Sequence, residues 1–401
     1  MWSVASKKLF SDEGFRPDQE DHVFAAFAVR VGLEIGVGEA SERLAMEAVR
    51  SHMRILEAVV DSMVITTSPP EPMLAIAAAM AMNHSEETYE KALGTLLDKL
   101  ILKGVVLDRG LLGELSSRLL LLRARDKATP GGCIDTDPVK VQPRVRPILL
   151  SKFLTTLLGD TLGLPSDRDD LSDDSDNRDN VRRKLLQEAS GVWINFTHIY
   201  QLPLSIVAVN ESMLVNAWST GAAFQCAHNQ PVIDGFIVGY HGPLDEPFQS
   251  SRLITIPWQT KAKSTAAASV LSHSLTAPFI IPQNGNRYKP WHVVILMDLA
   301  ASSAFEKVTG PHCQLTCEKA VRPKKGEGGQ GVWESYAETN EIEEQRYCLN
   351  IRGHRAKNYP VLVGLEKQFD TLFTRALDCP VPEFVPYAKT MAKARNCMIL
   401  D

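Results

Sequence analysis

Apolar residues recur every three or four positions through the first third of the chain, which is the spacing of one buried helix face. The pattern predicts helices within residues 22–36, 40–64, 69–83, 85–105 and 109–128. Ser41 and Ser85 are suitable N-caps, and Pro72 stands where a helix can begin. We therefore expect an all-α domain over residues 1–130.

The pattern changes at residue 184, where shorter apolar runs predict strands between helices. The expected strands are 222–227, 232–240, 252–262, 291–300 and 346–353. Helices are expected at the start of 184–202, over 211–221 and 359–377, and from Glu383 onward. Residues 184–401 should therefore form a mixed α/β domain.

The segment between these regions, 131–183, is predicted to be a linker. It contains one helical pattern at 146–163 and then a run crowded with aspartates, from Asp167 to Asp179. A calcium-binding loop needs a glycine turn and a closing glutamate, and the run has neither. Its composition instead favours a disordered, solvated stretch.

Two predicted strands carry polar residues where apolar ones are expected. Asp234 stands near the head of VIDGFIVGY, and LITIPWQTK ends in Gln259, Thr260 and Lys261. Strand alternation puts Gln259 and Lys261 on one face, opposite Ile254, Ile256 and Trp258. If the two strands pair as an antiparallel hairpin, Asp234 lies beside Gln259 and Lys261.

The order of these elements is a helix beginning at Glu211, a strand, a strand headed by Asp234, and a strand ending in Q-x-K. This order resembles the PD-(D/E)XK nuclease superfamily. The segments VWINFTHIY, GAAFQCAHNQPVIDG, LILKGVVLDRGLLGELSSRLLLLRARDKA and WQTKAK are also similar to large families expanded in mushroom-forming fungi. The resemblance implies a restriction-endonuclease-like core, with a mixed central sheet flanked by helices, preceded by a helical region.

The resemblance also implies a site. Asp234, Glu211 and Gln259 would hold Mg²⁺ or Mn²⁺, and Lys261 would orient the attacking water or stabilise negative charge. Oxygen ligands that leave positions open for water and phosphate suit such a cation for phosphodiester hydrolysis. The expected function is therefore metal-dependent cleavage of DNA or RNA, with the choice between them left open.

Two departures from the superfamily pattern support an alternative. Gln259 stands where a carboxylate is usual, and Pro257 lies inside a strand that should be central, where proline cannot donate to the ladder. The alternative is a catalytically inactive nuclease-like module that binds nucleic acid or protein. A third interpretation is a helical interaction scaffold with an incidental α/β region.

Several basic residues could line a nucleic-acid groove through phosphate contacts, with Trp258 and Tyr288 between them. They are Arg252, Lys263, Lys289 and His228, the last six residues before Asp234. For each of these residues taken singly, a solvated surface position is as consistent with the sequence as a nucleic-acid contact.

The remaining candidates favour structural roles. The HCQLTC stretch at 312–317 lacks the second pair of ligands that a zinc site needs, and His198 and Asp298 suit strand-end positions. Charged residues of 109–128 should form helical ion pairs that fix packing; they include Glu114, Arg118, Arg123 and Asp126.

Composition narrows the class of protein. The 401 residues are 44% hydrophobic and 23% charged, with a net charge of −5, so bulk positive charge cannot drive nucleic-acid binding. No 18-residue apolar run and no N-terminal signal segment stand out, and the seven cysteines form no dense framework. We expect an intracellular protein, cytoplasmic or nuclear, with no membrane partner and with a protein partner for its helical domain.

Overall fold

The structure is a computed structural model. It describes residues 2–33, 35, 38–60, 63–68, 71–105, 112–129, 146–162, 173–202, 205–206, 208–227, 230–261, 276, 279, 291–299, 313–321 and 343–378. None of its described helices combines the length and the apolarity needed to cross a membrane.

The N-terminal region is mainly helical, as predicted. Its helices are α1 (Trp2–Phe10), α2 (Glu20–Val31), α3 (Glu39–Ser51), α4 (Pro72–Met82), α5 (Glu86–Thr95), the π-helical turn η1 (Leu96–Ile101) and α6 (Leu112–Ala128). Pro72 begins α4, and the Ser85 hydroxyl caps α5 by accepting the Thr88 N–H at 3.0 Å. Ser41 is not a cap, because α3 begins two residues earlier and the Ser41 hydroxyl donates to the Val105 carbonyl.

A β-hairpin interrupts this region, so the expected helix over 40–64 and the all-α description are wrong there. Helix α3 ends at Ser51, and the backbone of Met53 has a positive φ of 59°, which a helix cannot continue through. Strands β1 (Ile55–Val60) and β2 (Met63–Thr67) then pair antiparallel. The valine, isoleucine and threonine residues of these strands suit a pleated strand better than a helix.

The second half of the chain builds a mixed sheet. Its strands are β3 (Ile148–Leu149), β4 (Val192–Ile194), β5 (His198–Gln201), β6 (Ala222–Gln225), β7 (Gly235–His241), β8 (Leu253–Lys261), β9 (Trp291–Asp298), β10 (Cys313–Val321) and β11 (Glu343–Arg352). The order is β10-β11-β9-β8-β7-β4-β3, with β6 paired to β7 and β5 to β6. Strand β7 is antiparallel to β6 and β8, whereas β9 is parallel to β8 and β11.

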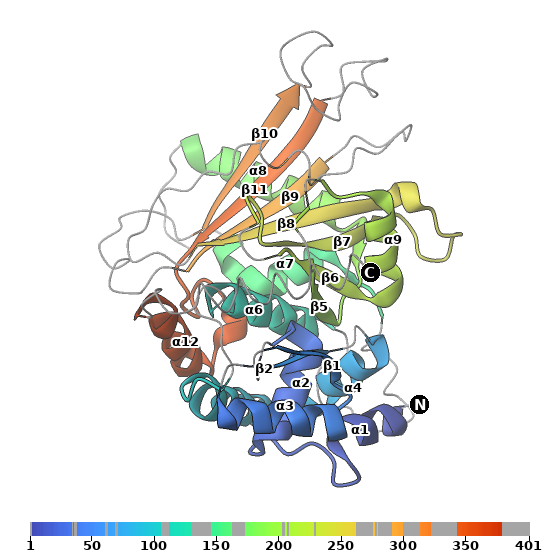
Figure 1. Ribbon diagram of the computed structural model, residues 1–401. Helices are drawn as coiled ribbons and strands as arrows, with labels where there is room; N and C mark the ends of the chain where they lie inside the picture. The colour runs from blue at the N-terminus through green and yellow to red at the C-terminus, as the bar shows by residue number, and fades with distance from the viewer. Residues whose placement is uncertain are drawn as a thin grey trace.

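Helices cover both faces of this sheet (Figure 1). They include α7 (Leu150–Leu158), α8 (Asp173–Ala189) and α9 (Glu211–Thr220), with the short 3₁₀ turns η3 (Gly159–Leu162) and η4 (Ser250–Arg252). Helix α12 (Glu366–Asp378) and the 3₁₀ turn η7 (Pro360–Leu362) pack on α6 instead. Helix α9 packs its Leu214 and Ala217 against Phe236 and Val238 of β7. Helices α6 and α7 lie between the sheet and the other N-terminal helices. The coarse prediction, a helical region followed by a mixed sheet with flanking helices, is confirmed.

The end of the acidic run is helical rather than disordered. Residues from Asp173 onward belong to α8, whose last turns bury Leu185 and Ala189 completely and pack Leu186 on the core. A helix that is anchored by its last turns can extend toward its N-terminus at little cost in free energy, because helix propagation is easier than nucleation. Residues 163–172, which include the rest of the run, lie outside the described residues.

One apolar core joins the two halves of the chain. A single cluster of buried residues includes Phe24 of α2 and Leu120 of α6 together with Ile256 and Trp258 of β8. The predicted divisions after residues 130 and 183 stay predictions, but α6 packs directly on the sheet.

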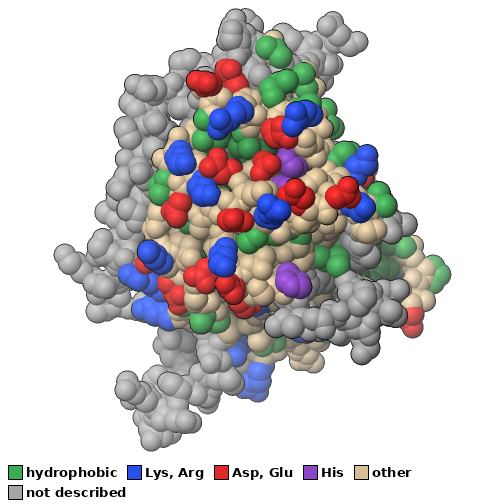
Figure 2. Space-filling view, turned by 90° about the horizontal axis from the view of Figure 1, so that it is seen from below, with side chains coloured by type: hydrophobic (Ala, Val, Ile, Leu, Met, Phe, Trp, Pro, Cys, Tyr) green, Lys and Arg blue, Asp and Glu red, His purple; other side chains and the backbone are tan. Residues whose placement is uncertain are grey.

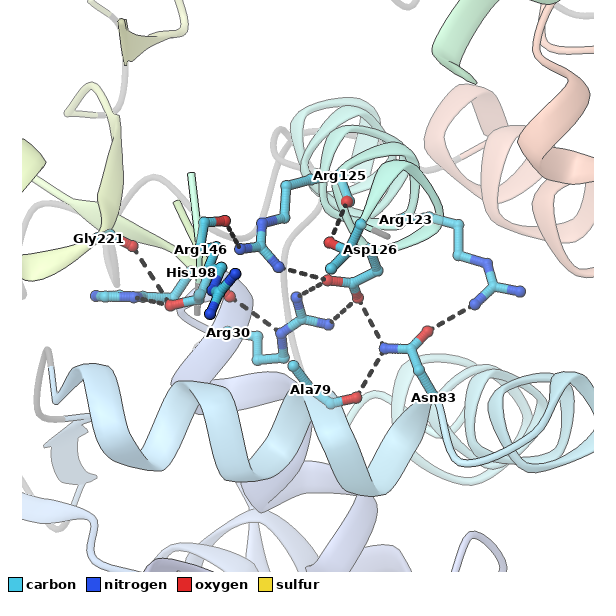
Figure 3. Close-up of polar contacts among 11 residues, drawn as sticks. Arg30, Ala79, Asn83, Arg123, Arg125, Asp126, Arg146, His198 and Gly221 are labelled. Carbon is cyan, nitrogen blue, oxygen red and sulfur yellow. Dashed lines mark hydrogen bonds and ion pairs between the residues drawn. The ribbon is translucent and has the colours of Figure 1, made fainter. Parts of the chain in front are cut away.

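A buried polar network runs through this junction (Figure 3). The Arg30 guanidinium donates to both oxygens of Asp126, at 2.7 and 3.0 Å, and to the Thr197 carbonyl at 3.1 Å. Asn83 donates to the same carboxylate at 2.8 Å. The Arg30 and Asp126 side chains are only 3% and 5% exposed, so this pair ties α2, α6 and the residue before β5 together.

Removing one partner of this pair should be costly. We expect Arg30→Met to lower the free energy of unfolding by about 3–5 kcal/mol, because Asp126 loses its bidentate partner inside the core. The control is Arg50→Met, since Arg50 is 78% exposed in its ion pair with Glu47 and should contribute about 0–1 kcal/mol. Equal losses in urea denaturation of the two variants would contradict this interpretation.

His198 belongs to this interior rather than to a cleft. It is 2% exposed, and burial, aided by the Arg30 charge, lowers its pKa to about 4. The unfolded chain, with a histidine pKa near 6.5, therefore binds this proton at a higher pH than the folded protein does. The stability that neutral His198 contributes is present above pH 6.5 and is lost as the pH falls toward 4.

A His198→Gln variant should show a weaker acid dependence. Between pH 6.5 and 4 the free energy of unfolding of the wild type should fall more steeply than that of the variant, by up to about 1.4 kcal/mol per pH unit. This slope corresponds to the uptake of one proton on unfolding. Urea denaturation at half-unit pH steps measures both slopes. Parallel slopes over this window would show that His198 is not kept neutral by folding.

Candidate functional site

The start of β7 and the end of β8 lie side by side at the same end of these two central strands, as the sequence predicts. Gly235 is paired with Trp258, and the Asp234 N–H donates to the Trp258 carbonyl at 2.9 Å. The Asp234 carboxylate then accepts the Thr260 N–H at 2.5 Å. This aspartate side chain therefore satisfies a backbone donor of β8 just beyond the regular ladder.

Strand β8 has the alternation that was predicted. Ile254, Ile256 and Trp258 face the common core, whereas Thr255 faces away from it and donates to the Phe279 carbonyl at 2.8 Å. Pro257 does not break the strand, since the registered pairing with β9 begins one residue later, at Trp258. Pro257 is paired with Phe236 of β7 and precedes only the β9 ladder, to which it could not donate.

The chain needs a glycine directly after Asp234. A Cβ at Gly235 would lie 2.3 Å from the Trp258 ring and 2.3 Å from the Phe224 carbonyl oxygen. Only a residue without a side chain lets β7 approach both neighbours this closely. The close contact of Gly235 with the buried Trp258 therefore fixes the position of Asp234.

The turn before Asp234 is strained. Val232 has a φ of +78°, and the Ile233 N–H donates to the Pro231 carbonyl at 2.9 Å, which makes a γ-turn of the rare positive-φ kind. A β-branched residue is disfavoured there. The Val232 side chain packs partly against the apolar cluster that contains Val294 and Leu296 of β9, which holds the turn in place. Such strain concentrates at functional sites.

Glu114, near the start of α6, completes the cluster. Its carboxylate accepts the Gln225 amide N–H at 2.6 Å. Burial, and after it the charge of Asp234, raises the pKa of the Glu114 carboxyl to about 8, while Arg118 acts in the opposite direction. Burial likewise raises the pKa of Asp234 to about 6, against the lowering effects of the Thr260 N–H and Lys261. Burial thus disfavours the anionic form of both acids, and the charge of Asp234 further opposes the ionisation of Glu114.

The sequence did not identify Glu114 as part of this site. It placed Glu114 in a helical ion-pair set with Arg118, but the Arg118 guanidinium donates to the Val31 carbonyl at 2.5 Å. The acid expected from the sequence, Glu211, lies exposed in the first turn of α9. Among the interactions of described residues, none joins Glu211 to Asp234. The acid that acts electrostatically on the Asp234 region comes from α6 instead.

Gln259 and Lys261 lie where the sequence expected them, at the end of β8. Gln259 is 7% exposed, and Lys261, which is partly exposed, lowers the pKa of Asp234. On the other side, Lys261 is in register with Asp298 of β9, which is 2% exposed. The neighbouring ends of β7, β8 and β9 thus carry Asp234, Gln259, Lys261 and Asp298.

The expected nucleic-acid contacts are only partly described. Arg252 precedes β8 and forms an ion pair with Glu246 at 2.8 Å, so it lies at the far end of that strand, roughly 30 Å from Lys261 at about 3.3 Å per residue. Lys263, His228 and Lys289 lie outside the described residues. On the face seen in Figure 2, basic and acidic side chains are interspersed, and no patch of one sign dominates that view.

Within the described ranges, no group of three or more His, Cys, Asp or Glu side chains is placed to hold a metal ion. Cys313 and Cys317 of β10, which form no disulfide, are therefore not part of such a group among the described residues. Around Asp234 a cation would have to be held by two carboxylates, Glu114 and Asp234, with amide oxygens added. That is a hard-oxygen set of the kind that Mg²⁺ and Mn²⁺ accept.

A separate hollow of about 470 Å³ lies in the helical region. Its lining residues come mainly from α1, α4, α5 and the segment before α2, and include Phe15, Met80 and His84. None of them belongs to the cluster around Asp234. The lining of the hollow is mainly apolar, and the hollow does not contribute to the chemistry described above.

Comparisons with protein-family models, curated proteins and solved structures found no match to this chain. The function of this chain must therefore be inferred from the residues where β7 begins and β8 ends.

The strain at Val232 leads to a prediction about stability. At a residue with ordinary helical backbone, glycine is less stable than alanine by about 1 kcal/mol. At Val232 the order should reverse, with Val232→Gly more stable than Val232→Ala by about 1 kcal/mol, because alanine keeps the positive-φ strain. Asn216, exposed in the middle of α9, is the control site and should show the usual order. Alanine proving the more stable at both sites in thermal melts would mean that Val232 is not strained.

Proposed function

We propose that this protein hydrolyses phosphodiester bonds of nucleic acid with a divalent cation held by Asp234 and Glu114. The observation that carries the proposal is the Asp234 carboxylate, which accepts the Thr260 N–H at 2.5 Å at the end of β8, where the charge of Lys261 lowers its pKa and its own charge raises the pKa of the buried Glu114. Each acid is disfavoured as an anion by burial, and the charge of Asp234 also acts on Glu114. A divalent cation would relieve both effects, which is why the donor set fits Mg²⁺ or Mn²⁺.

When bound, such a cation would activate water and neutralise phosphate charge. The residues of this chain would divide the remaining work. Asp234 and Glu114 would hold the cation, and the Thr260 N–H would keep the Asp234 carboxylate in one orientation. Lys261, at the partly exposed end of β8, would donate to a phosphate oxygen or to the attacking water.

The arrangement of strands supports the PD-(D/E)XK resemblance as part of this proposal. Strands β6, β7 and β8 follow one another as an antiparallel meander, with Asp234 at the head of the second and Gln259 and Lys261 at the end of the third. The helix directly before this meander, α9, does not bring its acid to Asp234. We therefore assign the helix acid to Glu114 of α6 in place of Glu211.

The test is cleavage of mixed DNA and RNA substrates with Mn²⁺ or Mg²⁺. Asp234→Asn and Glu114→Gln should each reduce cleavage by at least about a hundredfold, because each removes a carboxylate from the cation. Glu211→Gln is the matched comparison, the same change in an exposed helix acid, and should cleave as the wild type does. Loss of cleavage in Glu211→Gln together with full cleavage in Glu114→Gln would refute the assignment of Glu114.

A second candidate is a catalytically inactive module that binds nucleic acid or protein. It is favoured by Gln259, which lacks the negative charge of a carboxylate, and by the lack of a third described acid at the cluster. Under this alternative, wild-type protein would bind nucleic acid without cutting it, and Lys261→Ala would weaken that binding. An intracellular place of action, in the cytoplasm or nucleus, belongs to both candidates and agrees with Cys226 and Cys348 forming no disulfide.

A further inference from the structure

We propose that Arg352 and Lys261 together bind two neighbouring phosphates of the nucleic-acid substrate, at the carboxyl ends of β8, β9 and β11. This inference rests on the proposed function, because it takes nucleic acid to be the substrate. It adds Arg352 of β11, a residue that the motif along the chain did not include.

Three parallel strands place Lys261, Asp298 and Arg352 in one row. Asp298 of β9 is in register with Lys261 of β8 on one side and with Arg352 of β11 on the other. Residues in register on neighbouring strands share one face of a sheet. At about 4.8 Å per strand, the backbones of Lys261 and Arg352 are roughly 10 Å apart.

This row faces away from the common core. Met297 and Ile351, which come directly before Asp298 and Arg352, both belong to that core. Alternation therefore turns Asp298 and Arg352 to the opposite face of the sheet. Lys261 faces the same way, because it is in register with Asp298.

The row begins at the candidate site. Thr260, the residue before Lys261, donates its N–H to the Asp234 carboxylate at 2.5 Å. A strand of nucleic acid that lies along the row from Arg352 to Lys261 would therefore lead to Asp234.

Hydrogen bonds beyond the regular ladder fix the backbone of the row. The Lys261 carbonyl accepts the N–H of the residue after Asp298, and the Asp298 carbonyl accepts the Gly353 N–H, both at 2.7 Å. The Asn358 side chain donates to the Arg352 carbonyl at 2.7 Å. The three strand ends are therefore held in place before any ligand binds.

The two basic side chains of the row are available to an anion. Lys261 and Arg352 are both partly exposed, and neither forms an ion pair with another residue that the structure describes. Asp298 between them is only 2% exposed, so the long basic side chains can extend past its carboxylate into solvent. The buried negative charge also reduces the repulsion between the two cations.

The position and chemistry of the row suit phosphates. Ligands of parallel strands bind outside their carboxyl ends, which is where β8, β9 and β11 place these residues. The arginine guanidinium can bind two phosphate oxygens at once, and the lysine acts as a point charge. Because the net charge of the chain is −5, binding should depend on a few local contacts such as these.

The test measures binding of short fluorescent single strands of DNA and RNA to the full chain in a chelator, so that nothing is cleaved. Arg352→Gln should weaken binding at low salt by about tenfold, because a charged hydrogen bond to phosphate is lost. The slope of log affinity against log salt concentration should become shallower by about 0.7, the value for one phosphate contact. Arg352→Lys keeps the charge and should keep the slope.

Arg252→Gln is the matched control. It makes the same change of charge at the opposite end of β8, where Arg252 forms an ion pair with Glu246. This variant should bind within about twofold of the wild type and with the same salt slope. Equal losses in Arg352→Gln and Arg252→Gln would show a general effect of net charge and would overturn the inference.

The outcomes separate this inference from the proposed function. If Arg352→Gln keeps the affinity and slope of the wild type while Asp234→Asn abolishes cleavage, this inference alone fails. If Arg352→Gln weakens binding as expected but the wild type cuts nothing, the inference stands and the proposed hydrolysis fails. A wild type that binds neither strand in the chelator overturns the inference, whether or not it cuts.

Circular dichroism checks that Arg352→Gln is folded. If it is not, chemical modification of the wild type by phenylglyoxal, followed by mass spectrometry, decides the matter. A bound strand should slow the modification of Arg352 and leave that of Arg252 unchanged. Equal rates at Arg352 with and without the strand would overturn the inference.

Discussion

The buried pair of Arg30 and Asp126 is the interaction on which the candidate site depends. It joins α2 to the C-terminal part of α6 and, through the Thr197 carbonyl, to the sheet. Near the other end of α6, Arg118 donates to the last residue of α2, Val31. With α6 held at both places, Glu114 is fixed against Gln225. Buried ion pairs often add little net stability, and their best-supported use is to select one arrangement over others. Here we infer that the selected arrangement is the register of α6 on the sheet.

The opposite side of the site is built by backbone constraints. Three such constraints surround Asp234. The turn at Val232 is strained, position 235 accepts only glycine, and the Thr260 N–H is bound by the Asp234 carboxylate. Each of these features lowers local freedom without adding much buried apolar area. Their concentration at one aspartate indicates that its position matters more than the stability of the turn.

Much of this architecture could be predicted from the sequence, because it depends on local periodicity. The meander of β6, β7 and β8 follows from the alternation of apolar residues. Helix α9 follows from its two caps: the Asn210 side chain at its start, and Gly221, with a positive φ of 63°, at its end. The approach of Asp234 to the end of β8 follows from a hairpin with a predictable register. The hairpin β1–β2 was missed because its apolar spacing also fits a helix, and only the backbone at Met53 ends α3 before it.

The contribution of α6 to the site could not be predicted in this way. Glu114 and Gln225 are 111 residues apart, and nothing local to either residue indicates that they meet. The sequence offered Arg118 as the natural partner of Glu114 at i+4, and the structure gives Arg118 a backbone acceptor on α2 instead. Long-range packing therefore decides which acid lies within electrostatic range of Asp234, whereas a motif along the chain pointed to Glu211.

The proposed function requires that Glu114 and Asp234 bind one divalent cation together. Anomalous scattering from crystals soaked with Mn²⁺ tests it most directly, because the peak locates the metal without reference to activity. We expect a single peak bonded to carboxylate oxygens of both Glu114 and Asp234. A peak bound by Asp234 and Glu211, or no peak beside well-ordered Glu114 and Asp234 side chains, would contradict it.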